Sequence, residues 1–419
     1  MIVKVTTIIL FYATFLTVNT EEAFGKQSIP EILSLIKSEN NSILAARQAL
    51  EASNFAKKGT GYIPDPFFKV NIFGSPIETR NGPQKSNVML TQPIPWPSAL
   101  RAEIDLATSK ESLKREQLEI LLLDLEYYAK SMIFKHVELT EKLKNKTRMV
   151  NTLNNLSKVV LGRLELGTAS QSEISRINIE IATILQKIRE IKAKNIEVEN
   201  ILKTLSGGKD VSALLPEKFE VQWGRLGQKS LQDLNIKSHP LIRLANAKVN
   251  TARAVIAQAR AKRLPKIGAS VSWFRIDKPQ SIMGATDAGK DAWAVGASVS
   301  LPLWQGKYDS MENSSIAKLS ESELELAQKQ IELTEGINSI FENFKSVRDI
   351  TTMYLNDILP QAIQTLKSES DSYSQGKSTF EKVIESYLRI VKFEDQLIEN
   401  QVKQATLKAA LEKMSGQSL

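Results

Sequence analysis

Two segments in the second half of the chain alternate between apolar and small or polar residues. Residues 266–275 read KIGASVSWFR, and residues 293–301 read WAVGASVSL. Because successive side chains of a β-strand point to opposite faces, this spacing predicts two strands with one apolar face and one small, polar face. The first half shows the same alternation less cleanly, with apolar positions at Phe68, Val70, Ile72, Val88 and Leu90. Gly/Pro-rich polar segments, residues 74–87 and 276–292, predict a loop between the strands of each pair.

The longest hydrophobic pattern has helical spacing. No proline or glycine interrupts the chain from Ser98 until Gly162, and the helix is predicted to run to about Glu165. Apolar or small residues recur there at alternating steps of four and three, the spacing of a coiled-coil seam. They are Leu118, Leu122, Leu125, Ala129, Met132, His136, Leu139 and Leu143. At about 1.5 Å per residue such a helix spans about 100 Å, far more than a compact domain needs.

The chain contains two copies of one unit. Residues 38–66 and 238–266 align at an offset of 200, and an offset of 209 then holds at three separated landmarks. These are Pro93 with Pro302, Gly167 with Gly376, and Ser206-Gly207 with Ser415-Gly416. We therefore predict repeats at residues 25–207 and 228–419, with a linker at 208–227. Each repeat is predicted to contain, in this order, a helix (about residues 28–58 in the first copy), a strand, a loop, a second strand, a long helix, the tip turn and a final helix.

Prolines and a tryptophan mark both junctions between strand and long helix. QPIPWP at residues 92–97 precedes the first long helix, and LPLWQGK at 301–307 precedes the second. Proline cannot donate to a strand ladder but suits a helix start, so we expect the prolines to end the strand and Ser98 to cap the helix. Tryptophan suits a membrane interface. The candidate junction residues are Pro93, Pro95, Trp96, Pro97, Pro302 and Trp304.

Residues 1–24 have the layout of a secretory signal: one lysine, an apolar run, then polar residues. The run is shorter than the roughly 20 residues of a membrane-crossing helix, and a buried first helix is the alternative. No later segment has the length and freedom from charge of such a helix. A closed β-barrel is the remaining way to cross a bilayer, and four strands are too few to close one, so strands from several chains must be pooled.

Composition excludes several classes of function. The net charge of +8 is spread over helices in which basic and acidic residues interleave, which predicts a solvated surface and no nucleic-acid partner. The chain has no cysteine and only two histidines, His136 and His239, in different segments. We therefore predict no metal site, no cofactor and no catalytic residues, and conclude that the protein is not an enzyme.

The duplicated strand-and-long-helix unit behind a secretory signal resembles the TolC-type outer-membrane efflux duct family. The resemblance rests on QPIPWP, LPLWQGK, LPQA at 359–362, LELGTASQSEI at 164–174 and SYSQGKSTFEKVIESY at 372–387. It implies a mainly α protein with a small β part. A homotrimer then forms a 12-stranded barrel in outer-membrane lipid and a helical tunnel through the periplasm. It further implies a periplasmic adaptor (membrane fusion) protein and an inner-membrane pump as partners, with drugs or heavy-metal ions as cargo. The two predicted loops are then extracellular.

The resemblance also implies a gate at the periplasmic tip, where the turns at Gly167 and Gly376 lie. The family narrows its tunnel with acidic residues six and nine positions after the second turn glycine, which here are Lys382 and Glu385. The lysine departs from that pattern and puts a purely acidic constriction in doubt. The candidate gate residues are Glu385, Glu381, Lys382, Tyr373, Glu173 and Arg176.

A second class of function stays open from the residues alone. A periplasmic coiled-coil adaptor or scaffold would use the alternating segments as a soluble β-domain. The apolar strand faces distinguish the two functions, because they contact lipid in a duct and lie in a protein core in a scaffold.

Overall fold

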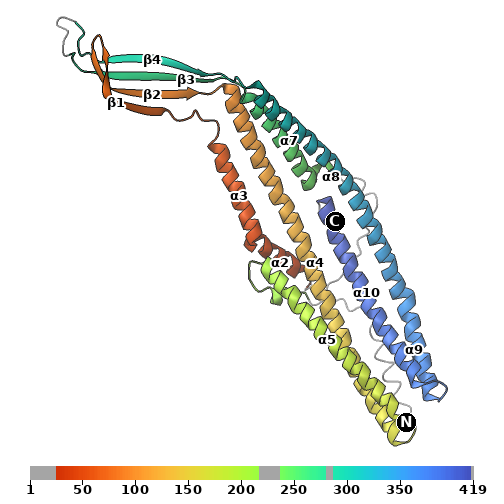
Figure 1. The fold of residues 1–419 in the computed structure, drawn as a ribbon. Coiled ribbons are helices and arrows are strands. Elements are labelled where there is room, and N and C mark those ends of the chain that lie inside the picture. The colour runs from red at the N-terminus through yellow and green to blue at the C-terminus, as the bar shows by residue number, and fades with distance from the viewer. Residues whose placement is uncertain (1–24, 217–235, 280–285, 417–419) are drawn as a thin grey trace. The chain divides into compact units, whose positions relative to one another are not determined.

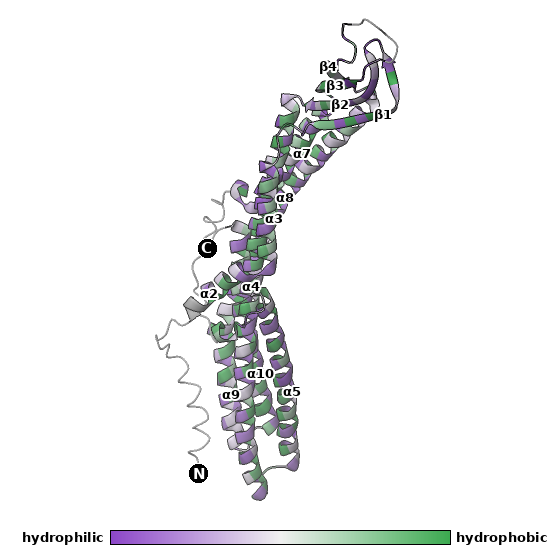
Figure 2. Ribbon diagram, turned by 90° about the vertical axis from the view of Figure 1, so that its left-hand side faces the viewer, coloured by the Kyte–Doolittle hydropathy of each residue, from purple (hydrophilic) through white to green (hydrophobic). Residues whose placement is uncertain are grey.

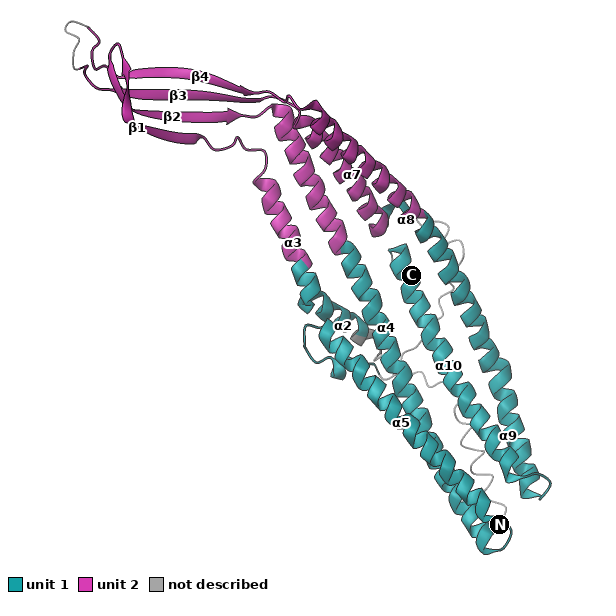
Figure 3. Cartoon of the chain, in the orientation of Figure 1, with its two compact units in different colours: residues 1–45, 119–239, 331–419 teal, residues 46–118, 240–330 magenta. Residues whose placement is uncertain are grey.

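The computed structural model describes residues 25–216, 236–279 and 286–416. The chain divides into two compact units: unit 1, residues 1–45, 119–239 and 331–419, and unit 2, residues 46–118 and 240–330 (Figure 3). Each unit therefore draws on both predicted repeats. The predicted signal, residues 1–24, and part of the predicted linker, residues 217–227, lie outside the described residues.

Unit 2 contains a four-stranded sheet with the order β1-β2-β3-β4 (Figure 1). Its strands are β1 (Phe67–Thr79), β2 (Gly82–Ile94), β3 (Lys266–Ile276) and β4 (Ala292–Ser300). All three pairings are antiparallel. Because β1 and β4 each have one neighbour in this order, they are the edges of the sheet.

The register places the apolar positions of all four strands on one face. Opposite one another lie Val70 and Val88, Val88 and Trp273, and Trp273 and Trp293. The next row towards the helices contains Phe68, Leu90, Val271 and Val295. The other face carries small residues where β3 meets β4, for example Ser270 opposite Gly296. The predicted alternation is thus confirmed.

The prediction of a loop over residues 74–87 was wrong. β1 continues to Thr79 and β2 starts at Gly82, with a register shift after Ile72. Gly82 adopts a φ of 126°, and Thr79 Oγ1 donates a hydrogen bond to Gly82 O at 2.6 Å. The residues there are polar because a hairpin end in water has no apolar face, so their composition resembled that of a loop. The second predicted loop is confirmed for residues 277–279 and 286–291, which lie between β3 and β4.

Long helices make up most of the rest of the described chain. They are α2 (Gly25–Glu39), α3 (Asn41–Lys58), α4 (Pro97–Glu165), α5 (Gln171–Leu205), α7 (Pro240–Ala261), α8 (Gln305–Met353), α9 (Leu359–Ser374) and α10 (Phe380–Ser415). α4 has 69 residues, which confirms the predicted unbroken helix. A π-helical segment, Tyr354–Ile358, lies between α8 and α9. It precedes Pro360, which lacks the N–H that an α-helical turn would use. None of the described helices is both long and apolar enough to cross a membrane.

The helices of unit 1 pack through two apolar clusters. One draws Leu153 from α4, Ile177 from α5 and Ile384 from α10, all fully buried. The other joins α2, α4 and α5 around Ile36, Ala129 and further apolar residues. Hydrophobic and hydrophilic residues follow one another along α5, α9 and α10, as expected for helices buried on one face (Figure 2). Several seam positions of the predicted coiled coil are indeed buried: Leu118, Ala129, His136 and Leu139.

The N-terminal helix predicted over residues 28–58 is divided at Asn40. The Asn40 side-chain oxygen accepts hydrogen bonds from the backbone N–H groups of Ser42 and Ile43, at 3.0 and 3.2 Å. Its side-chain nitrogen donates to Leu205 O, the last residue of α5, at 2.8 Å. Asn40 thus caps α3 and satisfies a carbonyl at the end of α5, which a continuous helix would not do.

Candidate functional site

The two glycine turns close their helical hairpins in the same way. Gly167 and Gly376 have φ of 70° and 72°. The N–H groups of Gly167 and Thr168 donate to Leu164 O and Arg163 O, both at 2.9 Å. The second turn repeats these bonds 209 residues later, from Gly376 to Tyr373 O at 3.1 Å and from Lys377 to Ser372 O at 2.8 Å. A Cβ at either glycine would meet no atom within 4 Å, so backbone conformation and not space requires glycine here.

Two side chains of the first hairpin, Arg163 and Glu173, meet Tyr373 of the second. The Arg163 guanidinium lies 4.5 Å from the centre of the Tyr373 ring. The Tyr373 hydroxyl donates to a Glu173 carboxylate oxygen at 3.4 Å. Burial raises the pKa of Tyr373, and the negative charge of Glu173 raises it further, so the phenol remains a proton donor at neutral pH. Arg163 was missed from the sequence, where a basic residue near a helix C-terminus has an ordinary capping explanation.

The predicted gate residues of α10 lie next to this cluster. Glu381 forms an ion pair with Arg176 of α5. Glu381, Lys382 and Glu385 are all exposed, and Glu381 and Glu385 are four residues apart, on one face of α10. Among the described residues, neither Lys382 nor Glu385 has an ion-pair partner. The structure therefore pairs Arg176 with Glu381 and Tyr373 with Glu173. The charges of Lys382 and Glu385 face solvent.

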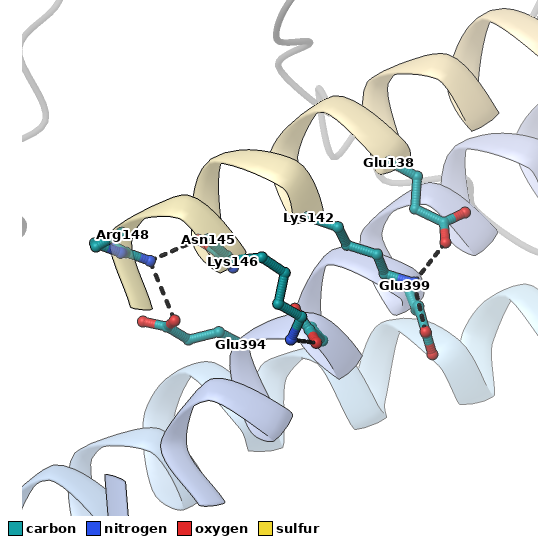
Figure 4. Close-up of polar contacts among 8 residues, drawn as sticks. Glu138, Lys142, Asn145, Lys146, Arg148, Glu394 and Glu399 are labelled. Atoms are coloured by element: carbon teal, nitrogen blue, oxygen red, sulfur yellow. Dashed lines mark hydrogen bonds and ion pairs between the residues drawn. The ribbon is translucent and has the colours of Figure 1, made fainter. Parts of the chain in front are cut away.

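A second set of ion pairs links α4 to α10 further from the turns (Figure 4). Lys142 binds Glu138 at 2.7 Å and Glu399 at 2.6 Å. Arg148 lies 3.1 Å from Glu394, and Lys146 pairs with Asp395. The basic partners of these cross-helix pairs come from α4 and the acidic partners from α10. We call this set the α4–α10 ladder.

The ladder is partly withdrawn from water. Burial alone would lower the pKa of Lys142, but the hydrogen bonds and negative charges of Glu138 and Glu399 together outweigh burial and raise it. Burial likewise opposes ionisation of Glu138, yet Lys135 and Lys142 lower its pKa below 4.5. For Glu394 burial outweighs Arg148, and its pKa is raised. Sequence analysis did not find the ladder, because the pairing depends on how α4 and α10 meet.

In unit 2 the structure corrects two predictions about the junctions between strand and long helix. Pro93 was expected to end the strand but lies inside β2, opposite Gly268, and is tolerated because the β1–β2 pairing stops at Thr91. Ser98 was expected to cap the helix, but α4 starts at Pro97, and Trp96 O accepts hydrogen bonds from residues 99 and 100 at 2.9 and 3.1 Å.

The other junction residues flank the two helix starts. Pro95 lies between β2 and α4, and the Trp96 indole donates to Pro265 O at 2.5 Å. Pro302 and Trp304 lie between β4 and α8, and Trp304 is 79% exposed.

The apolar face of the sheet is exposed on the single chain. Trp293 and Val295 are 74% and 70% exposed, and Val271 and Trp273 are also exposed. A soluble β-domain would cover such a face, so the structure does not favour the adaptor or scaffold.

Comparison with known proteins agrees with this interpretation. Residues 231–417 match the family "Outer membrane efflux protein". No curated protein matches the chain. Among solved structures, the outer-membrane channel OprN has a TM-score of 0.79 at 13% identity, covering 94% of this chain and 91% of its own. CusC has 0.78 at 14%, covering 93% and 92%. VceC from Vibrio cholerae has 0.76 at 16%, covering 93% and 96%.

These TM-scores show that the chain shares the fold of outer-membrane channels, and the match to the outer membrane efflux protein family covers nearly all of the second predicted repeat.

Proposed function

We propose that this chain is an outer-membrane efflux channel, and that three copies of it assemble into the passive exit duct of a tripartite pump. Each copy supplies four strands to a 12-stranded barrel and its helical hairpins to a periplasmic tunnel. One observation carries the proposal: the sheet has an exposed apolar face and two open edges, β1 and β4. Unpaired backbone groups at a strand edge cost several kcal/mol each in lipid, so a partner must pair with both edges.

The same reasoning assigns the two ends of the duct. The apolar face contacts lipid, and Trp96 and Trp304 lie at the membrane interface where strands give way to helices. The loops between strands are extracellular. The turns at Gly167 and Gly376 form the periplasmic tip, where an adaptor and an inner-membrane pump deliver drugs or metal ions.

The tip residues form the gate of this duct. Threefold symmetry brings three copies of Glu385, Glu381 and Lys382 towards one axis, while Arg176 holds Glu381 within each copy. The closed state is a ring of mixed charge, and its links need only a few kcal/mol in total to hold the duct shut and still yield to an adaptor.

Disulfide cross-linking tests the assembly, because the chain contains no cysteine of its own. In one chain β1 and β4 are separated by two strands, about 14 Å, beyond the roughly 7 Å between Cα atoms that a disulfide spans. We expect Val70→Cys combined with Cys at Val295, Ala297 or Val299 to give oxidised dimers and trimers on a denaturing gel, for at least one combination. Val88→Cys on the inner strand β2, with the same β4 partners, is the control and should stay monomeric. Monomers from every β1–β4 pair, with a folded monomeric mass in detergent, would contradict the proposal.

A further inference from the structure

Between the helices and the register shift of β1, the sheet carries positive charge and no negative charge. Residues 67–72, 86–94, 266–276 and 292–300 contain Lys69, Lys266 and Arg275 but no Asp or Glu. The one acidic residue elsewhere in the strands is Glu78, which lies beyond the register shift of β1 and pairs with Pro83 near the hairpin turn.

The register decides which face each basic residue occupies. Lys69 lies opposite Met89, which lies opposite Ser272, so Lys69 belongs to the small, polar face. Lys266 lies opposite Ser300 and shares that face with Ser270 and Ser272. Arg275 lies two residues after Trp273 on the same strand, so it belongs to the apolar face. Both lysines are exposed.

The carboxylates at the hairpin end of the sheet are engaged by other groups there. Asp277 lies 3.7 Å from Lys85, and Asp287 lies 2.6 Å from Lys290. Asp291 accepts a hydrogen bond from the backbone N–H of Ile276 at 2.9 Å. These groups follow β3 or precede β4, so they lie at the hairpin end of the sheet and not along the small face.

We propose that Lys69 and Lys266 make the barrel lumen selective for anions, so that the duct favours small anionic cargo. This rests on the proposed trimeric barrel, in which the small face lines the lumen. Three chains place six fixed positive charges in two tiers. The tiers lie six residues apart along β3, or about 20 Å at about 3.3 Å per residue. Charged rings in a water-filled pore with low-dielectric walls concentrate ions of opposite sign and exclude ions of like sign.

Single-channel recording tests the inference in planar bilayers. The full-length trimer is measured in the Arg176→Ala background, so that the tip conducts, under a KCl gradient near 0.1 M where the screening length is about 10 Å. We expect K69Q/K266Q to lower the chloride-to-potassium permeability ratio by about twofold or more. Tripolyphosphate added from the barrel side should block the parent and lose its block in K69Q/K266Q.

Matched variants control for folding and for charge in general. K69R/K266R keeps the positive charge and should behave as the parent, whereas Arg275→Gln removes one charge from the lipid-facing side and should leave the ratio unchanged. Trimers that conduct with equal selectivity in K69Q/K266Q and Arg275→Gln would overturn the inference and leave the proposed duct intact. Failure of the parent chain to form trimers would remove the duct and the inference together.

Discussion

The α4–α10 ladder and the tip pair Arg176–Glu381 both join the two hairpins by opposite charges, but in different surroundings. In the ladder, Lys146 and Asp395 are 10% and 21% exposed. At the tip, Arg176 and Glu381 are 44% and 58% exposed. Exposed ion pairs contribute about 0 to 1 kcal/mol to the free energy of unfolding. Removing one partner of a buried pair costs about 3 to 5 kcal/mol, because the other charge stays buried without a partner. In the proposed duct, the tip is therefore the part that opens, while the ladder keeps the hairpins together.

Breaking the ladder should have the largest effect on stability. Lys146→Ala leaves Asp395 largely buried without its partner, and we expect a loss of about 2 to 3 kcal/mol in the free energy of unfolding, less than for a fully buried pair. Denaturant unfolding followed by circular dichroism in detergent measures it. The control is Lys209→Ala, which removes an exposed pair with Glu39, 53% and 39% exposed, and should cost under about 1 kcal/mol. Equal losses of unfolding free energy in the two variants would show that the ladder pairs contribute no more to stability than exposed pairs do.

Changing the turn glycines should have a smaller effect, of about 1 to 2 kcal/mol each, in unfolding measurements. Gly167→Ala and Gly376→Ala put a side chain on a backbone with positive φ, although neither Cβ meets a neighbour. Gly162→Ala is the matched control: it lies inside α4, also in open space, and should stabilise by up to about 1 kcal/mol. A stabilising Gly167→Ala would show that the turn does not need this conformation.

Breaking the tip pair should affect conductance more than stability. Arg176→Ala removes an exposed link and should raise the basal conductance in planar bilayers while changing unfolding by less than about 1 kcal/mol. Replacing Glu381 and Glu385 with Ala should alter conductance or its block by multivalent cations. Parent-like conductance in both variants would place the constriction elsewhere.

The smallest predicted effect is a dependence of stability on pH through His136. Burial lowers the pKa of His136 below 6.5, although Glu199, 3.7 Å away, and Asn195 oppose that shift. The unfolded chain therefore binds a proton more readily, and stability should fall as pH falls through 6.5, by less than about 1.4 kcal/mol per unit. His136→Asn should flatten this part of the profile. Below pH 4.5 both proteins should lose stability as Glu138 of the ladder is protonated. An unchanged slope between pH 6.5 and 5 in His136→Asn would contradict the prediction.

Several features of this fold were predictable because they depend on local periodicity. The four strands, their apolar face and the unbroken α4 follow from spacings of two and of about three and a half residues. The turns at Gly167 and Gly376 were found because the two glycines are landmarks of the repeat, and the positive φ of both explains why glycine stands there. The extension of β1 and β2 into residues 74–87 was missed, because strand residues that are polar on both faces show no alternation of apolar and polar positions. The break at Asn40 was missed because it is stabilised by a hydrogen bond that the Asn40 side chain donates to Leu205 O, far away in the sequence.

The sequence by itself determined which segments contain the four strands and the long helices, and which face of each strand is apolar. Only the tertiary structure decided which charged and aromatic side chains meet. Arg163 with Tyr373, Arg176 with Glu381, and Lys146 with Asp395 are contacts between residues more than two hundred positions apart. Local periodicity involves residues only a few positions apart, so the secondary structure that it favours can be predicted from the order of apolar and polar residues. An ion pair depends on the rotation and axial offset of two packed helices, which the whole core sets.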